Sequence, residues 1–169
     1  MSHISVGVEY GLHCLLFLTP SHIGDSDATV RDLADLQGVP VEFLAKLFTK
    51  LHKAGLTVAT EGKKGGFRLA RAPEDISVLD VVEAIDGVKP LFHCREVRTR
   101  CAVFDGNVPA WAMRGTCSIH AVMLDAERKM RDALASQTLA DLSNATAAKA
   151  PRSFAGNVIS WMEKRSAAR

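Results

Sequence analysis

Two short amphipathic segments, residues 29–38 and 40–55, follow one another with almost no chain between them, and this feature constrains the fold more than any other. Thr29 can cap the first helix, which we expect to stop near Gly38. Pro40 suits the first turn of the second helix, and the glycine at its end supplies the stop. Two short helices joined by about four residues predict a helix-turn-helix. The apolar side of the second helix is Phe43, Leu44, Leu47, Leu51 and Ala54.

A glycine-rich, basic hairpin is predicted directly after these helices. Residues 56–60 are rich in β-branched side chains, and residues 67–70 form a second short run. Between them lies Glu61-Gly62-Lys63-Lys64-Gly65-Gly66, which is typical of the tip that joins two antiparallel strands. Helices are also expected over residues 4–18 and over a segment that Ser77 caps and that ends at Gly87.

Positive charge is concentrated in this region, although the whole chain carries a net charge of only +2. Between Glu42 and Arg71 there are seven basic and two acidic residues, a local balance of +5. A winged helix-turn-helix presents this second helix and hairpin tip to a major groove and the adjacent phosphates. Each lysine taken singly is more typical of a solvated surface, but the combination predicts double-stranded operator DNA as a partner. The expected DNA contacts are Thr29, Glu42, Phe43, Lys46, Lys50, Lys63, Lys64 and Arg68.

The second half of the chain is expected to contain a long loop followed by a long helix. Residues 88–116 lose all periodicity yet contain Cys94 and Cys101, and cysteines in a loop of this length favour a functional role. From 117 to 142, apolar residues repeat at spacings of three and four, which predicts a helix whose apolar stripe needs a partner. A second copy of the chain is the simplest partner, so we expect a homodimer. Residues 143–169 are predicted as a linker and a C-terminal helix that docks back. Its docking residues are Phe154, Val158, Trp161 and Met162.

These segments predict a mainly α protein with a small β-hairpin wing, a winged helix-turn-helix over residues 1–87 followed by a long dimerisation helix. No apolar run approaches the roughly 20 residues of a membrane helix, and no export signal is visible. We therefore expect a soluble cytoplasmic protein with no membrane partner. Four cysteines are too few for a disulfide scaffold, which leaves metal binding, redox chemistry or burial. Cys14 lies among leucines and is predicted to be a buried small hydrophobe.

Four motifs together resemble the Rrf2 family of winged-helix repressors: residues 39–46 (VPVEFLAK), 53–56 (KAGL), 62–67 (GKKGGF) and 79–87 (LDVVEAIDG). The likeness spans roughly residues 1 to 142. It implies a dimeric transcription regulator in which residues 88–116 form a cluster-binding loop.

The resemblance also implies a set of cluster ligands. Many family members have three closely spaced cysteines in the loop, whereas here six residues lie between Cys94 and Cys101, and fifteen between Cys101 and Cys117. The segment 7–14 resembles the one that supplies a carboxylate and an imidazole in a redox-sensing member of the family. The resemblance thus implies a [2Fe-2S] cluster held by Cys94 and Cys117 of one subunit and by Glu9 and His13 of the other. Cys101 and His120 are reserve ligands.

The residue pattern by itself is compatible with this set and leaves alternatives open. Glu9 and His13 stand four apart on one helix face, a spacing that suits two ligands of one metal but is more often a hydrogen-bonded surface pair. Cys117 and His120 form a Cys-x-x-His pair that would equally suit zinc, a thiol switch or a thiol nucleophile. No oxyanion loop or substrate pocket is visible, so we expect no enzyme. A zinc- or thiol-switch winged-helix regulator without a cluster remains the alternative function.

Overall fold

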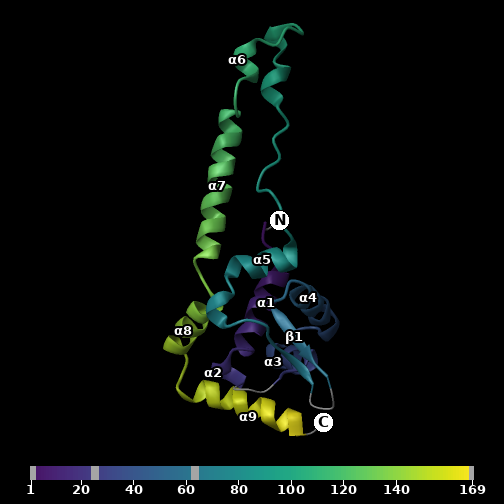
Figure 1. The fold of residues 1–169 in the computed structure, drawn as a ribbon, viewed down its shortest axis with the longest axis vertical. Helices are drawn as coiled ribbons and strands as arrows, with labels where there is room; N and C mark the ends of the chain where they lie inside the picture. Colours follow the sequence, from purple (N-terminus) through teal and green to yellow (C-terminus); the bar gives the residue numbers. More distant parts are fainter. Residues whose placement is uncertain (1–2, 24–26, 62–64, 168–169) are drawn as a thin grey trace. The chain divides into compact units, whose positions relative to one another are not determined.

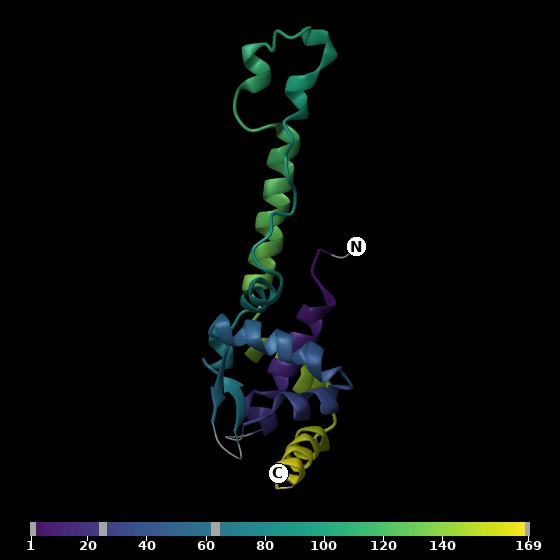
Figure 2. The same ribbon diagram turned by 90° about the vertical axis from the view of Figure 1, so that its right-hand side faces the viewer.

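A computed structural model describes residues 3–23, 27–61 and 65–167 of the chain (Figures 1 and 2). The chain divides into two compact units. We call residues up to Gly87 together with residues from Leu134 onward the core unit, and Val88–Ala133 the loop–helix unit. The two units are described separately below.

The core unit is mainly helical with one small hairpin, which confirms the predicted fold class. Helix α1 packs against α3, α4, α5 and α8. The buried core includes Leu15 of α1, Phe48 of α4 and Val81 of α5. Its elements are α1 (Val6–Phe17), α2 (Pro20–Ile23), α3 (Val30–Gln37), α4 (Val41–Lys53), β1 (Thr57–Thr60), β2 (Gly66–Leu69), a 3₁₀ turn (Pro73–Asp75), α5 (Val78–Asp86), α8 (Leu139–Lys149) and α9 (Ser153–Ala167).

Helix α3 begins and ends where the sequence predicts. The Thr29 hydroxyl accepts a hydrogen bond from the Asp32 amide at 3.1 Å, and the Asp32 carboxylate reaches back to the Thr29 amide. This capping box satisfies main-chain donors that a helix start leaves without partners. Gly38 then ends the helix in the left-handed conformation, with φ of 66°. The chain therefore turns at once into α4, as a helix-turn-helix requires.

The hairpin is antiparallel, with Thr57 opposite Leu69 and Thr60 opposite Gly66. A third segment joins its edge, because Ala28 and Phe67 exchange two main-chain hydrogen bonds of 2.8 and 3.1 Å. A Cβ atom on Gly66 would lie 2.7 Å from the Ala28 main chain. Gly66 is thus required for close packing of the hairpin against the segment that contains Ala28.

The C-terminal part differs from the sequence prediction at one point. The helix expected over 117–142 ends at Ala135, and a second helix, α8, starts after Thr138. The physical reason is a capping box, in which the Thr138 hydroxyl accepts from the Asp141 amide at 3.1 Å. As a result, most of the predicted linker, up to Lys149, is helical. Helix α9 docks back on α2 as expected, with Val158 and Met162 buried (Figure 1).

The loop–helix unit contains the 3₁₀ turns Val97–Arg100 and Ala102–Phe104, the short helix α6 (Ala110–Met113) and most of α7 (Ser118–Ala135). The segment that follows Val88 runs back along α7 (Figure 2). There the Leu91 amide donates to the Glu127 carboxylate at 3.0 Å. The predicted loop is therefore built of short turns. Among the described residues, no helix is both long and apolar enough to cross a lipid bilayer.

Candidate functional site

Helix α4 presents a polar side to solvent while its apolar side is buried. Leu44, Leu47, Phe48 and Leu51 face the core, whereas Glu42 and Lys46 are exposed one turn apart. The second helix of a helix-turn-helix is the element that enters the major groove. Helix α4 therefore keeps a polar side exposed at the position that a helix-turn-helix presents to DNA.

Phe43 lies at the edge of this exposed side and is 37% exposed. Its ring meets the ring of Tyr10 edge to face, with centroids 5.7 Å apart. Such a pair contributes about 0.5–1.5 kcal/mol beyond its buried area. The contact joins α1 directly to α4.

Lys50 has a role inside the protein. Its ammonium donates a 2.6 Å hydrogen bond to the carbonyl of Ile85, in the last turn of α5. A cation at a helix C-terminus satisfies a free carbonyl and complements the helix dipole. Lys50 thus fastens α4 to α5, so one of its three donors is already in use.

The other predicted DNA contacts differ in how far the structure describes them. Arg68 is exposed on strand β2, opposite Val58. The hydroxyl of Thr29 is committed to the cap of α3, where it also donates to Asp32 at 2.6 Å. Lys63 and Lys64 lie outside the described residues.

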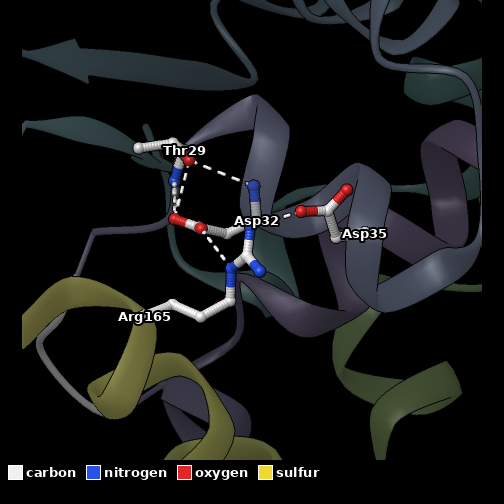
Figure 3. Close-up of polar contacts among 4 residues, drawn as sticks. All are labelled: Thr29, Asp32, Asp35 and Arg165. Atoms are coloured by element: carbon white, nitrogen blue, oxygen red, sulfur yellow. Dashed lines mark hydrogen bonds and ion pairs between the residues drawn. The ribbon is translucent and has the colours of Figure 1, made fainter. Parts of the chain in front are cut away.

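An arginine of α9 binds two carboxylates of α3 (Figure 3). The Nε atom of Arg165 donates to Asp32 at 2.9 Å, and a terminal nitrogen pairs with Asp35. The hydrogen bond to Asp32 is the main reason that the pKa of Arg165 is raised. The guanidinium also lies 4.9 Å from the ring centroid of Trp161. The C-terminal helix is thereby attached to the first helix of the helix-turn-helix, a contact that sequence reasoning missed.

Glu9 and His13 are exposed on α1, and neither side chain forms a hydrogen bond or ion pair with any described residue. The hydrogen-bonded surface pair that their spacing also allowed is therefore not formed. Both residues line an apolar groove of about 1110 Å³ in the core unit. The apolar lining of the groove includes Leu12, Leu16, Val82, Leu142 and Phe154.

The four cysteines are free thiols in very different surroundings. Cys14 is fully buried, as predicted, and burial raises the pKa of its thiol to about 12. Cys94 and Cys117 are half-buried, and Cys101 is exposed. The Cys94 sulfur lies 3.8 Å from a Glu96 carboxylate oxygen. The candidate thiolates are thus partly shielded but reachable.

The reserve ligand His120 lies in the first turn of α7. Its ring contacts that of Phe92, with centroids 6.1 Å apart. Within the described ranges, no group of three or more His, Cys, Asp or Glu side chains is placed to hold a metal ion. Glu9 and His13 belong to the core unit, and the three non-buried cysteines belong to the loop–helix unit.

Comparison with known proteins agrees with this architecture. Residues 4–145 match the Rrf2 family, which is described as iron-dependent transcriptional regulators. The protein Rrf2 of Nitratidesulfovibrio vulgaris is 34% identical over 134 residues, which cover 79% of this chain and 82% of that protein.

Two solved structures share the fold. IscR from T. potens is 25% identical with a TM-score of 0.64, covering 89% of this chain and 93% of the other. CymR of B. subtilis, described as the global cysteine regulator of that organism, is 21% identical with a TM-score of 0.67, covering 86% of this chain and 99% of the other.

The family match settles two of the expectations from the sequence. Proteins of this family are transcriptional regulators that bind DNA and are not enzymes, which confirms both the predicted DNA partner and the absence of catalysis. The match covers the helix-turn-helix, the hairpin, α5, the loop and α7. The chain therefore belongs to the Rrf2 family of transcriptional regulators.

Proposed function

We propose that this regulator senses redox state through a [2Fe-2S] cluster held between two subunits, by Cys94 and Cys117 of one and by Glu9 and His13 of the other. The observation that carries the proposal is the exposure of Glu9 and His13 and their lack of a bonding partner in the described part of the chain. A carboxylate and an imidazole lie on the same face of α1, exposed and without a partner among the described residues. Because they also line an apolar groove, a second molecule that covers the groove would enclose them.

The donor set suits an iron-sulfur cluster chemically. Thiolates bind ferric iron, and imidazole and carboxylate can replace two of four thiolates. Such a cluster supplies a centre that gains or loses one electron. Cys94 and Cys117 bind by losing their thiol protons, while Glu9 and His13 carry no competing salt bridge to any described residue. The same ligand types occur in the redox-sensing regulator RsrR, which segment 7–14 resembles.

Two surfaces that the single chain leaves uncovered support the proposed homodimer. None of the residues of α7 is buried, and Ile119, Val122 and Leu124 are exposed. The groove that contains Glu9 and His13 is lined mainly by apolar side chains. A second copy of the chain buries both surfaces and brings the four ligands together. We propose that this dimer acts in the cytoplasm, where a DNA-binding regulator of this family would meet its operator.

Helix α1 connects the proposed ligands to the DNA-binding surface. A Cβ atom on Gly11 would lie 2.4 Å from the Ile85 side chain, so a larger residue at this position would displace that side chain where α1 packs on α5. Tyr10 contacts Phe43 at the edge of α4. A displacement of Glu9 or His13 therefore moves α4. Because the two half-sites of an operator lie about 34 Å apart, a small shift of both copies of α4 removes contacts at both.

In the DNA complex we assign α4 to the major groove, with Glu42, Phe43 and Lys46 near base edges. Arg68 and the hairpin tip residues Lys63 and Lys64 are assigned to phosphates. Lys50 contributes only through the donors that its bond to Ile85 leaves free.

The test is the absorption and electron paramagnetic spectrum of protein purified without oxygen. We expect Glu9→Ala and His13→Ala to change or abolish the cluster spectrum, whereas Cys101→Ser and His120→Ala preserve it. A spectrum that depends on His120 and Cys101 but not on Glu9 and His13 would assign the reserve ligands instead. A duplex selected from a random library then provides an operator. Equal affinity of the oxidised, reduced and cluster-free protein for it, at fixed salt, would rule out the switch.

A thiol or zinc switch without a cluster is the second candidate. It is favoured by Cys101, which is an exposed free thiol, and by the structural likeness to CymR proteins, of which the one from Staphylococcus aureus is solved in an oxidised form. Metal and sulfide analysis separates the candidates, because a cluster protein contains iron and acid-labile sulfide. A zinc protein is colourless, and a thiol switch forms a disulfide that mass spectrometry detects.

A further inference from the structure

A single arginine links the two ends of the segment between Cys94 and Cys117. Arg98 lies in the first 3₁₀ turn of the loop–helix unit. One terminal nitrogen of its guanidinium donates to the Gly115 carbonyl at 2.7 Å, and the other donates to the Arg114 carbonyl at 3.4 Å. Because Gly115 precedes Cys117 by two residues, these bonds hold the main chain just before the second thiol.

The same guanidinium reaches toward the first thiol. Its Nε atom donates to one carboxylate oxygen of Glu96 at 2.9 Å, and the other oxygen accepts from the Cys94 thiol at 3.8 Å. The backbone of Glu96 is left-handed, with φ of 49°, which is uncommon for a residue with a side chain. The contacts therefore run continuously from Cys94 through Glu96 and Arg98 to Gly115.

Apolar packing in this loop is limited to partly exposed contacts such as that between the rings of Phe104 and Trp111, whose centroids are 5.8 Å apart. Among the described residues of the loop–helix unit, only Ala112 is buried. Arg98 is among the more shielded polar residues there, with its side chain 24% exposed. A guanidinium has five donors in one rigid plane, which lets it bind a carboxylate and two carbonyls at once, whereas a lysine offers a single point charge. The conformation of the loop thus depends on the shape of the arginine as well as on its charge.

We propose that Arg98 is a positioning residue, which holds the segments of Cys94 and Cys117 in one arrangement before any cluster is bound. The proposal rests on the proposed function, because it assumes that these two thiols are the ligands. Arg98 itself is not a ligand. Its effect is to reduce the conformational entropy that the loop loses when both thiolates bind one centre.

The test compares Arg98→Gln and Arg98→Lys with Arg100→Gln in the full-length protein. Arg100 is an exposed arginine of the same turn for which the structure gives no side-chain bond to a described residue. We call the bonds of Arg98 to Glu96, Arg114 and Gly115 the clamp. The first readout is amide hydrogen exchange in cluster-free protein at Thr99 and Arg114, whose amides donate to the carbonyls of Glu96 and Trp111 beside this clamp. The second is the rate at which a chelator bleaches the cluster of the loaded protein.

We expect Arg98→Gln to raise exchange at both amides by about tenfold and to speed cluster loss by a similar factor. Arg98→Lys should recover only part of each effect, and Arg100→Gln should match the wild type. Unchanged exchange in Arg98→Gln would overturn the clamp. Faster exchange with an unchanged rate of cluster loss would overturn the positioning role. A wild-type chain that binds no cluster would refute the proposed function, and the role with it, whereas the exchange result would still report on the clamp.

Discussion

The core unit and the loop–helix unit use their apolar residues in opposite ways. The core unit buries Leu15, Leu33, Phe48 and Ile76 completely. The loop–helix unit buries only Ala112 among the residues described, although it has apolar side chains of similar size. Its exposed large apolar residues are Val88, Val97, Val103, Trp111, Met113, Ile119, Val122 and Leu124.

This difference shows which unit has a buried apolar core within a single chain. Burial of apolar surface is the main driving force of folding, so the core unit has its own source of stability. The loop–helix unit has polar contacts such as those of Arg98, and it leaves apolar side chains exposed that we propose a second copy of the chain covers. The following predictions test the contrast, beginning with the largest expected effect.

The largest expected difference between the two units is the rate at which their thiols are alkylated. With a pKa of about 12, Cys14 is a thiolate in only about one molecule in ten thousand at pH 8, and it is also inaccessible. Cys101 is exposed. We expect iodoacetamide to label Cys101 in cluster-free protein at least a thousandfold faster than Cys14, measured by mass spectrometry of peptides. Denaturation provides the control, since both should then react alike. Fast labelling of Cys14 in the native protein would contradict a well-packed core.

Removing side-chain volume should lower the free energy of unfolding strongly in the core unit only. Leu15→Ala leaves a cavity beneath α1 and should lower the free energy of unfolding by about 2–5 kcal/mol. Val103→Ala, at a residue that is 86% exposed, should change it by less than about 0.5 kcal/mol. Denaturant titration of both variants measures the difference. A large loss for Val103→Ala would mean that its unit has a core of its own.

The sequence predicts those features of the core unit that depend on neighbouring residues. Thr29 and Ser77 cap their helices through residues three positions away, and Gly38 ends α3 in the conformation that favours glycine. The break between α7 and α8 also has a sequence signal, because Thr138 and Asp141 form the same capping pattern at the start of α8. The apolar periodicity continues past Ala135, so periodicity alone predicts one longer helix and hides this break.

Contacts between distant residues have no such signature. Arg165 and Asp32 are 133 positions apart, and nothing near either residue specifies the pair. The bond from Lys50 to Ile85 is similar, since a lysine on an exposed helix face predicts solvent or phosphate equally well. For the candidate site, the residue types and the resemblance indicated Glu9 and His13. Their assembly with Cys94 and Cys117 involves a second chain, so it stays a prediction.

Charge on the apolar stripe of α7 should separate the subunits. Val122→Glu puts a carboxylate on a residue that is exposed in one chain and, we propose, buried in the dimer. We expect a monomer by sedimentation and affinity for a two-half-site duplex reduced by about a hundredfold, because the half-sites no longer bind as a unit. Ala121→Glu, about 100° around the same helix and outside its apolar stripe, is the matched control and should remain dimeric. Equal behaviour of the two variants would exclude α7 as the dimer contact.

The smallest expected effect is the pH dependence that His22 gives to the docking of the C-terminal helices. His22 is buried, its Nδ1 atom lies 3.0 Å from the Thr19 hydroxyl, and its ring meets that of Phe154 edge to face. Burial lowers the pKa of His22, an effect that a contact with the Leu16 main chain partly opposes. The folded state therefore binds a proton less readily than the unfolded chain.

It follows that the stability from neutral His22 is fully present above the unfolded pKa of about 6.5 and is lost as the pH falls through the lower folded value. We expect the thermal midpoint of the wild type to drop by a few degrees more than that of His22→Asn between pH 7.5 and 5.5. Asparagine can place an amide nitrogen where Nδ1 lies, so it retains much of the contact without the titration. His3→Gln, at an exposed histidine, should follow the wild type. If His22→Asn shows the same pH dependence as the wild type, burial does not oppose protonation of His22 between α2 and α9. The core unit would then be more open to solvent at this point than its contrast with the loop–helix unit requires.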